Sequence, residues 1–137
     1  MSSPPVVGVA GKCCAGKDLA ARILTDAGYR SVDVDAIGHH ALTAKFDQVR
    51  DEFGEGVITD TGAVDRGKLG SIVFSDPTRM RRLETIVHPW MREEVARQVS
   101  SFRDANNSSR GLVINAALLF TMHLDPLCDH IVWVHAP

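Results

Sequence analysis

Short apolar runs recur along the chain, separated by longer segments with polar positions. The runs "PVVGVA", "LVINA" and "HIVWV" are rich in β-branched residues, which is typical of buried strands. The alternating stretch "YRSVDV" predicts a further short strand over residues 31–34, closely followed by two acids, Asp33 and Asp35. Strands that alternate with helical segments predict an α/β fold with a parallel sheet.

Between these runs, apolar residues are spaced three and four positions apart, which predicts helices. The first follows the glycine-rich turn and ends at Gly28, and the last two are separated by a break at Pro89. Ser75 or Asp76 is suited to cap the helix that begins at Pro77. The predicted helical stretches are 17–27, 39–53, 68–74, 77–88 and 90–102. The chain is therefore expected to form one domain, with a core over 1–34 and 110–137 and a helical insert over about 35–109.

Composition narrows the class of protein. Apolar residues make up 45% of the 137 residues, charged residues make up 23%, and the net charge is −2, which gives no reason to expect binding to nucleic acid or membranes. Neither a membrane span nor a secretory leader is expected. The three cysteines cannot all pair, and Cys13 and Cys14 are adjacent. These features predict free thiols and a reduced, cytoplasmic setting.

The segment "GVAGKCCAGKD" carries the clearest chemistry. Gly11, Gly16 and Lys17 satisfy the spacing of a phosphate-binding loop between a strand and a helix. In such a loop backbone N–H groups and the helix N-terminus surround phosphate oxygens, and the lysine reaches the β- and γ-phosphates. The alternative is a strand–turn–helix connection without a ligand.

Asp18 stands where this loop ordinarily has a hydroxyl residue. A carboxylate about 4 Å from a phosphate charge repels it by roughly 4 kcal/mol at an effective dielectric constant near 20. A bridging Mg²⁺ would reverse that penalty, because carboxylates are good Mg²⁺ ligands. The sequence therefore predicts metal-dependent nucleotide binding with Asp18 as a metal ligand.

The whole pattern resembles the dephospho-coenzyme A kinase family. The similarity runs from "GVAGKCCAGKD" through "VDVDAIG", "DTGAVDRGKLGSIVFSDP" and "RRLETIVHPWMR" to "LVINAALLF" and "HIVWVHAP", in the family's order and spacing. Its most specific parts are Asp65 to Pro77 and Leu83 to Arg92. The resemblance implies a P-loop kinase core with a helical substrate domain and a lid. It also implies transfer of the ATP γ-phosphate to the ribose 3′-hydroxyl of dephospho-CoA, the last step of coenzyme A biosynthesis, with Mg²⁺.

The resemblance also assigns roles to single residues. Lys17 would hold the transferring phosphates, and Asp33 would be the base for the hydroxyl, with a helix-capping role as its alternative. Arg66, His88 and Arg92 match acceptor-binding positions; the alternatives are solvent-facing charges for the two arginines and a packed residue for His88. Asp35 is the preferred helix cap. The expected ATP-binding residues are Gly11, Cys14, Ala15, Gly16, Lys17, Asp18 and Leu19.

Several positions depart from the family pattern. Asn115, Ala117 and Thr121 stand where "D-x-P-L-L-F-E" is usual, and an acid at 115 would help to organise Mg²⁺. Losing that acid while gaining Asp18 is either a relocation of charge within one metal site or decay. The sequence also ends at Pro137, before the family's lid and last strand, so we expect these residues to turn over substrate poorly. Two alternatives stay open: a non-catalytic relative that binds nucleotide or dephospho-CoA, and a different small-molecule P-loop kinase.

Overall fold

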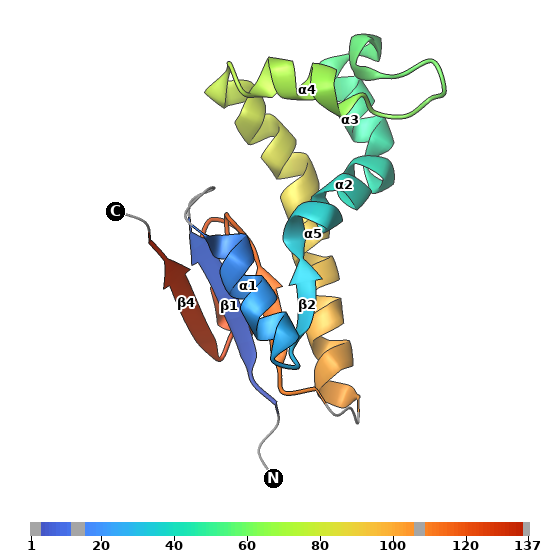
Figure 1. Cartoon of the computed structure of the whole chain (residues 1–137). Helices are drawn as coiled ribbons and strands as arrows, with labels where there is room; N and C mark the ends of the chain where they lie inside the picture. The colour runs from blue at the N-terminus through green and yellow to red at the C-terminus, as the bar shows by residue number, and fades with distance from the viewer. Residues whose placement is uncertain (1–3, 12–15, 106–108, 136–137) are drawn as a thin grey trace. The chain divides into compact units, whose positions relative to one another are not determined.

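Over the residues that the structure describes, the chain begins with strands and a helix in alternation and continues with four consecutive α-helices before its last two strands (Figure 1). The structure is a computed structural model, and it describes residues 4–11, 16–105 and 109–135. The elements, in order, are β1 (Val6–Gly11), α1 (Lys17–Asp26), β2 (Arg30–Asp33), α2 (Val34–Ala44), α3 (Phe46–Phe53), the 3₁₀ turn η1 (Glu55–Val57), α4 (Arg66–Val73), α5 (Pro77–Asp104), β3 (Leu112–Asn115), the 3₁₀ turn η2 (Asp125–Leu127) and β4 (His130–Val134).

Within the described residues the strands form one four-stranded sheet in the order β2-β3-β1-β4. Every pairing is parallel, and the register places Asp33 beside Asn115 and Val9 beside Asn115. β1 is buried along its whole length, which explains why its sequence is continuously apolar. The predicted α/β fold with a parallel sheet is therefore confirmed.

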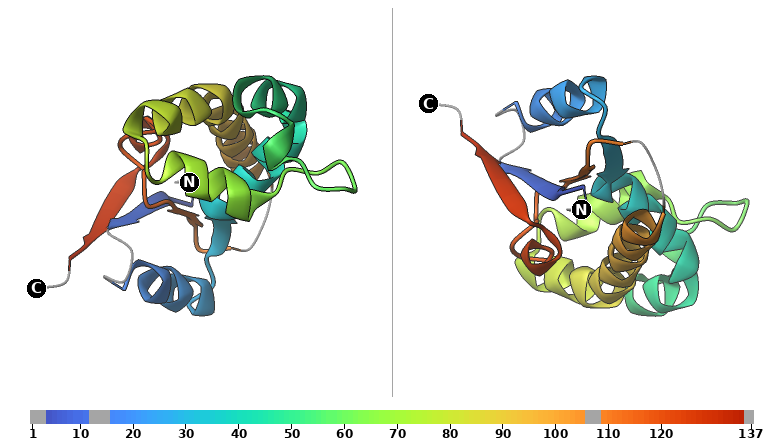
Figure 2. Two further views of the ribbon diagram at one scale, coloured as in Figure 1. Left: turned by 90° about the horizontal axis from the view of Figure 1, so that it is seen from above. Right: turned by 90° about the horizontal axis from the view of Figure 1, so that it is seen from below.

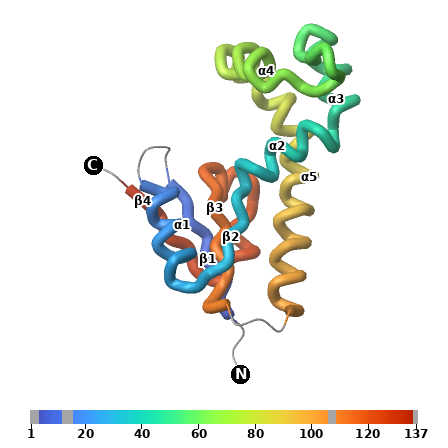
Figure 3. Tube along the Cα trace, turned by 45° about the vertical axis from the view of Figure 1, so that its right-hand side comes forward, coloured from blue at the N-terminus to red at the C-terminus, as the bar shows by residue number. Residues whose placement is uncertain are grey.

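Contacts between residues divide the chain into two compact units. The first contains residues 1–35 and 92–137, and the second contains residues 36–91. In the first unit α1 covers one face of the sheet, while the second half of α5 lies on the other face (Figures 2 and 3). The predicted division into a catalytic core and a substrate-binding insert stays a prediction.

The core of the first unit joins the sheet to α1. Val7, Val9 and Val113 are buried against Ala21, and the half-buried residues Ala20, Leu24, Tyr29 and Val134 pack around them. Alternate residues of the central strands, Val6, Leu112 and Ile114, are also buried, so both faces of the sheet are covered at its two central strands, β1 and β3. Among the described residues, no helix combines the length and apolarity that a bilayer span requires.

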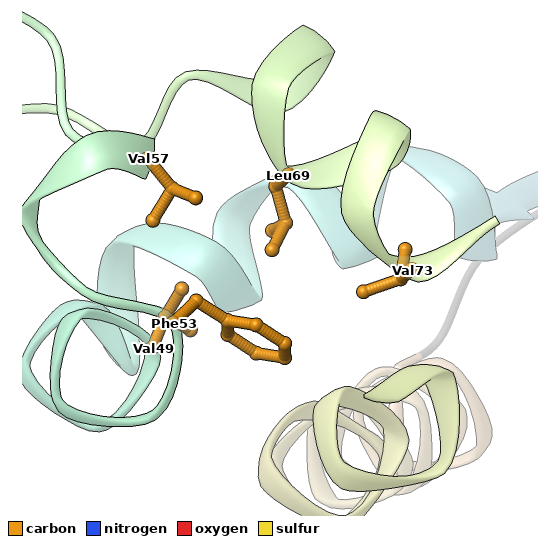
Figure 4. Close-up of a cluster of buried hydrophobic side chains, with 5 residues drawn as sticks. All are labelled: Val49, Phe53, Val57, Leu69 and Val73. Carbon is orange, nitrogen blue, oxygen red and sulfur yellow. The ribbon is translucent and has the colours of Figure 1, made fainter. Parts of the chain in front are cut away.

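The second unit has a separate core, shown in Figure 4. Val49 and Phe53 of α3 pack with Val57 of η1 and with Leu69 and Val73 of α4. The spacing of these apolar residues, four apart within each of the two helices, explains why both short helices form here. Helices of eight residues are marginal alone, so this shared cluster stabilises them.

We expect Leu69→Ala to destabilise the second unit by about 2–5 kcal/mol, because it removes a large side chain that is only 2% exposed and leaves a cavity. Phe74→Ala is the matched control, since this larger side chain lies at the end of the same helix but is 83% exposed. Chemical unfolding followed by circular dichroism measures both. Equal losses of stability in the two variants would contradict the assigned core.

The predicted helix break at Pro89 is wrong, because α5 runs unbroken from Pro77 to Asp104. Proline removes one backbone hydrogen bond and crowds the preceding turn, at a cost of about 3 kcal/mol. Buried side chains before and after Pro89, including Val87, Met91 and Val95, each contribute about 1.5–3 kcal/mol when removed from water. Their sum outweighs the local cost, so the helix continues through the proline.

Three helix starts also differ from the sequence prediction, those of α2, α3 and α4, the last of which begins at Arg66 and not at residue 68. The stretch predicted as one helix over 39–53 forms two, α2 and α3, and α2 begins earlier, at Val34, directly after β2. The start of α5 agrees with the prediction, since Asp76 Oδ1 accepts the backbone N–H groups of Thr78 and Arg79 at 3.0 and 3.4 Å. Gly28 has φ of 107° after the end of α1, which confirms its helix-stopping role.

Candidate functional site

The carboxyl ends of three neighbouring strands meet at one edge of the sheet. Gly11 ends β1, Asp33 ends β2 and Asn115 ends β3. In open parallel sheets this edge borders the crevice in which ligands bind. Lys17 and Asp18 begin α1, which follows β1 in the chain, so the polar residues of both segments belong to the same region of the first unit.

Two glycines shape the backbone on either side of the loop. Gly11 has φ of 151°, and a Cβ atom there would lie 2.5 Å from the carbonyl oxygen of Val134. Gly16 has φ of 95° and is the residue that precedes α1, where glycine leaves the first backbone N–H groups without a side-chain cap. Such N–H groups favour an anion at the helix start. Cys14 and Ala15, two of the predicted ATP-binding residues, lie outside the described residues.

Lys17 is the first residue of α1, yet it is only 6% exposed. Its Nζ donates hydrogen bonds to Asn115 Oδ1 at 2.5 Å and to Asp18 Oδ1 at 3.0 Å. A buried ammonium needs such acceptors, because an unpaired charge away from water is costly. The ammonium is thereby held at the carboxyl edge of the sheet, where a phosphate-binding loop requires it.

Asp18 completes this group, although its side chain is 87% exposed. Asn115 Nδ2 donates a hydrogen bond to Asp18 Oδ1 at 3.1 Å. This hydrogen bond, together with the hydrogen bond and the positive charge of Lys17, holds the pKa of the Asp18 carboxyl below its ordinary value. Asp18 is therefore a carboxylate at neutral pH.

Asp33 lies at the end of β2 and directly before α2. Its Oδ1 accepts the backbone N–H of Asp35 at 3.0 Å, which is the hydrogen bond of a helix N-cap. The expectation that Asp35 caps this helix is wrong, because the helix starts one residue after Asp33 and places Asp35 inside its first turn. The cap also orients the Asp33 carboxylate at the same edge of the sheet as Asn115.

The donors at this edge suit a magnesium ion that is shared with phosphate. Among the described residues no group of three or more His, Cys, Asp or Glu side chains could hold a metal unaided. Mg²⁺ in phosphoryl-transfer sites ordinarily takes one or two carboxylates and completes its shell with phosphate oxygens and water. The exposed Asp18 carboxylate, tied down through Oδ1, fits that requirement.

The remaining predicted residues that the structure describes are on α1, α4 and α5. Leu19 is 58% exposed on α1 and Arg92 is exposed on the part of α5 that belongs to the first unit. Arg66 is exposed at the start of α4, and His88 is half-buried on α5, both in the second unit. The structure therefore brings together Gly11, Gly16, Lys17, Asp18 and Asp33. Contact of Arg66, His88 or Arg92 with an acceptor stays a prediction.

His88 packs closer to the interior than a solvent-facing ligand residue would. Burial lowers the pKa of its imidazole, and Glu84, whose carboxylate lies 3.7 Å from Nδ1, opposes this effect only in part. Its folded-state pKa is below the ordinary value of 6.5, so the unfolded chain binds the proton more readily. His88 is therefore neutral at neutral pH.

It follows that stability should fall as the pH is lowered from about 7 through the unfolded pKa and on through the depressed folded pKa. We expect His88→Gln to flatten the pH dependence of the unfolding midpoint over that window. Urea unfolding at a series of pH values measures it, and His39→Gln, at an exposed position of α2, is the control. An unchanged pH profile in His88→Gln would contradict the effect of burial.

Sequence reasoning related position 115 to Asp18 only through the charge of a shared metal site. It missed the contacts of the Asn115 amide, which is a hydrogen-bond partner of both Lys17 and Asp18. The position of Asn115 at the end of a buried apolar run could have indicated this role. The carboxyl ends of parallel strands share one edge, so a polar residue there is close to the loop that follows β1.

The parallel sheet, the strand–glycine loop–helix arrangement and the buried lysine define the class of protein as a P-loop type α/β fold. The model of the family "Dephospho-CoA kinase" matches residues 5–137. The chain belongs to the dephospho-CoA kinase family.

Curated relatives agree with this family. A dephospho-CoA kinase of Symbiobacterium thermophilum is 38% identical over 136 residues, which are 96% of this chain and 56% of the relative. One of Borreliella burgdorferi is 30% identical over 135 residues, covering 98% of this chain and 63% of the relative. This chain thus spans somewhat more than half the length of these relatives.

Solved structures share the fold. A crystal structure of a Thermus thermophilus protein superposes with a TM-score of 0.78 at 27% identity, and the match covers 99% of this chain and 68% of the other. A dephospho-CoA kinase from Campylobacter jejuni superposes with a TM-score of 0.67 at 22% identity, covering 85% of this chain and 59% of the other. The second likeness supports the fold alone.

Proposed function

We propose that this chain carries the ATP site of a dephospho-CoA kinase and transfers the γ-phosphate of ATP to the ribose 3′-hydroxyl of dephospho-CoA. The observation that carries this proposal is the buried Lys17 ammonium, held at the carboxyl edge of the sheet by Asn115 and Asp18. Family membership supplies the acceptor. A place in coenzyme A biosynthesis and a cytoplasmic setting are parts of the same proposal.

Phosphoryl transfer requires positive charge on the phosphates and little covalent chemistry from the protein. Lys17 would provide this charge, and the α1 N-terminus behind Gly16 would add backbone N–H donors. Bound phosphate oxygens would compete with Asn115 and Asp18 for the ammonium hydrogens. Both partners are close enough to return Lys17 to its place after the product leaves.

Asp33 is the proposed proton acceptor. The 3′-oxygen forms a bond to the γ-phosphorus, the bond from that phosphorus to the β,γ-bridging oxygen breaks, and ADP leaves with the electron pair. The hydroxyl proton passes to the Asp33 carboxylate. The N-cap hydrogen bond from Asp35 uses Oδ1 and so restrains the orientation of the base.

Asp18 is the proposed metal ligand. Mg²⁺ would neutralise developing charge on the phosphates in the usual manner of kinases. Arg92 is a candidate for the acceptor pyrophosphate, because guanidinium groups pair with phosphate through two parallel hydrogen bonds. Arg66 and His88 are proposed as further acceptor contacts on the evidence of the family pattern.

Transfer from γ-labelled ATP tests the proposed function. The chain is incubated with Mg²⁺, labelled ATP and dephospho-CoA, and a parallel reaction contains coenzyme A, whose 3′-hydroxyl is already phosphorylated. We expect slow labelling, confined to the dephospho-CoA reaction, with the Symbiobacterium thermophilum relative as the positive control that turns over faster. Binding of both substrates without transfer would favour the non-catalytic alternative. Transfer to a different small-molecule acceptor would favour another P-loop kinase.

Nucleotide binding should depend steeply on divalent metal because of Asp18. The free carboxylate repels the triphosphate, whereas a bridging Mg²⁺ makes the contact attractive. We expect Asp18→Ser to bind ATP more tightly in chelator and to gain less from added Mg²⁺ than the wild type. Calorimetric titrations with Mg²⁺ and with EDTA measure this ratio, with the exposed Asp26→Asn as the control. An identical ratio in wild type and Asp18→Ser would show that Asp18 does not hold the metal.

A further inference from the structure

We propose that Asn115 is a positioning residue: its amide binds both the Lys17 ammonium and the Asp18 carboxylate. The site then works with a single carboxylate at the two positions 18 and 115. This inference rests on the proposed function and deepens it. Asn115 lies outside the phosphate-binding loop, and it determines where the negative charge of the site lies. Asp18 and Asn115 are 97 positions apart in the chain, yet their side chains are in contact.

The amide of Asn115 uses its two ends in opposite senses. Oδ1 accepts from the Lys17 ammonium at 2.5 Å, and Nδ2 donates to the Asp18 carboxylate at 3.1 Å. Lys17 and Asp18 close the triangle with their own contact of 3.0 Å. An amide satisfies a cation and an anion together, whereas a carboxylate offers only acceptors. An ionised aspartate at 115 would therefore lose the contact with the Asp18 carboxylate.

The charges of the triangle show why the two positions depend on each other. Lys17 and Asp18 balance, and Asn115 is neutral. An aspartate at 115 could not donate the hydrogen bond to Asp18, and its carboxylate would repel the Asp18 carboxylate at contact distance. The Lys17 ammonium would then face two negative charges. Removing the acid at 18 alone would leave the buried ammonium without an anion. Moving the acid from 18 to 115 would keep both the count of charges and the amide–carboxylate hydrogen bond, with its ends exchanged.

The two places for the acid are not equivalent in exposure. Asp18 is 87% exposed on the first turn of α1, whereas Asn115 is half-buried at the end of β3 beside Asp33. The acid at 18 keeps negative charge away from the strand end where Asp33 is the proposed base. Asn115 thus separates two carboxylates while it holds the lysine.

A charge-exchange cycle tests this inference in the full 137-residue chain. The four proteins are the wild type, Asp18→Asn, Asn115→Asp and the double variant that carries both changes. Titration calorimetry gives the affinity for ATP with Mg²⁺. We expect each single change to weaken binding and the double variant to recover it, with a non-additivity of about tenfold, as for side chains in direct contact. Asp26→Asn combined with Asn115→Asp is the control pair, and its effects should add.

A measurement without nucleotide keeps the inference separable from the proposed function. Thermal unfolding midpoints should show the same non-additivity, with each single variant less stable than the wild type and the double variant restored. The acylation rate of Lys17, followed by mass spectrometry, reports the charges that face the ammonium: it should rise in Asp18→Asn, which removes the neighbouring anion, and fall in Asn115→Asp, which adds one. If no protein binds ATP but the coupling in unfolding is present, the proposed function fails and the positioning role stands. Additive effects on unfolding would overturn the positioning role, whether or not ATP binds.

Discussion

Replacing Lys17 by alanine is expected to weaken the affinity for Mg·ATP by about 30-fold or more. This is the range for removing one partner of a buried, hydrogen-bonded charge pair, here the Lys17 ammonium and the phosphates of bound ATP. Lys17 is 6% exposed, and its ammonium meets Asn115 and Asp18 at hydrogen-bond distance. The variant removes the cation for the phosphates and also leaves the Asp18 carboxylate to repel them. Both effects act in the same direction, so the loss should exceed that of a single phosphate contact.

Titration calorimetry on Lys17→Ala and Lys68→Ala measures this effect. Lys68 is exposed on α4 in the second unit, so it controls for the loss of one positive charge from the chain. Circular dichroism verifies that both variants fold. An affinity in Lys17→Ala equal to that of Lys68→Ala would show that the phosphates do not bind at the start of α1.

Asp33→Asn is expected to lower kcat for phosphoryl transfer by about 10²–10⁴-fold, the usual contribution of a positioned general base, and to leave the affinity for Mg·ATP unchanged. Asparagine keeps the side-chain oxygen that accepts the Asp35 N–H, so the N-cap and the start of α2 are retained. The substitution therefore separates the two roles of Asp33. Only the proton acceptor is lost.

Steady-state transfer to dephospho-CoA and calorimetric ATP binding are measured on the same preparations. Asp35→Asn is the matched control, because it removes a neighbouring exposed carboxylate without touching the cap acceptor. Full kcat in Asp33→Asn would show that another group takes the proton. A parallel loss of ATP affinity would show that Asp33 binds nucleotide instead.

Much of the fold could be predicted because local patterns and long-range packing agree in it. The continuous apolar run of β1 reflects a strand buried on both faces, and Asp76 with Pro77 marks the start of α5. The parallel sheet and the order of strand, loop and helix were also predicted from the sequence. It did not locate the exact start of α2, because the cap of that helix depends on the rotamer of Asp33.

Pro89 shows where local rules failed. The rule that proline ends a helix concerns one hydrogen bond, whereas α5 is stabilised by buried side chains on both sides of the proline. Asn115 shows a different limit. Its contacts with Lys17 and Asp18 join residues almost a hundred positions apart, and no local pattern reports such a pair. The roles of Arg66, His88 and Arg92 stay predictions that follow from the family pattern.

The central claim is that ATP phosphates bind at the carboxyl edge of the sheet, beside Lys17. An amide-resolved NMR titration of the ¹⁵N-labelled chain with Mg·ATP tests it most directly. We expect the largest shifts on Gly11, on residues 16–19, on Asp33 to Asp35 and on Asn115. Saturating shifts confined to other elements, such as the second half of α5 or the strand β4, with none at these residues, would contradict it.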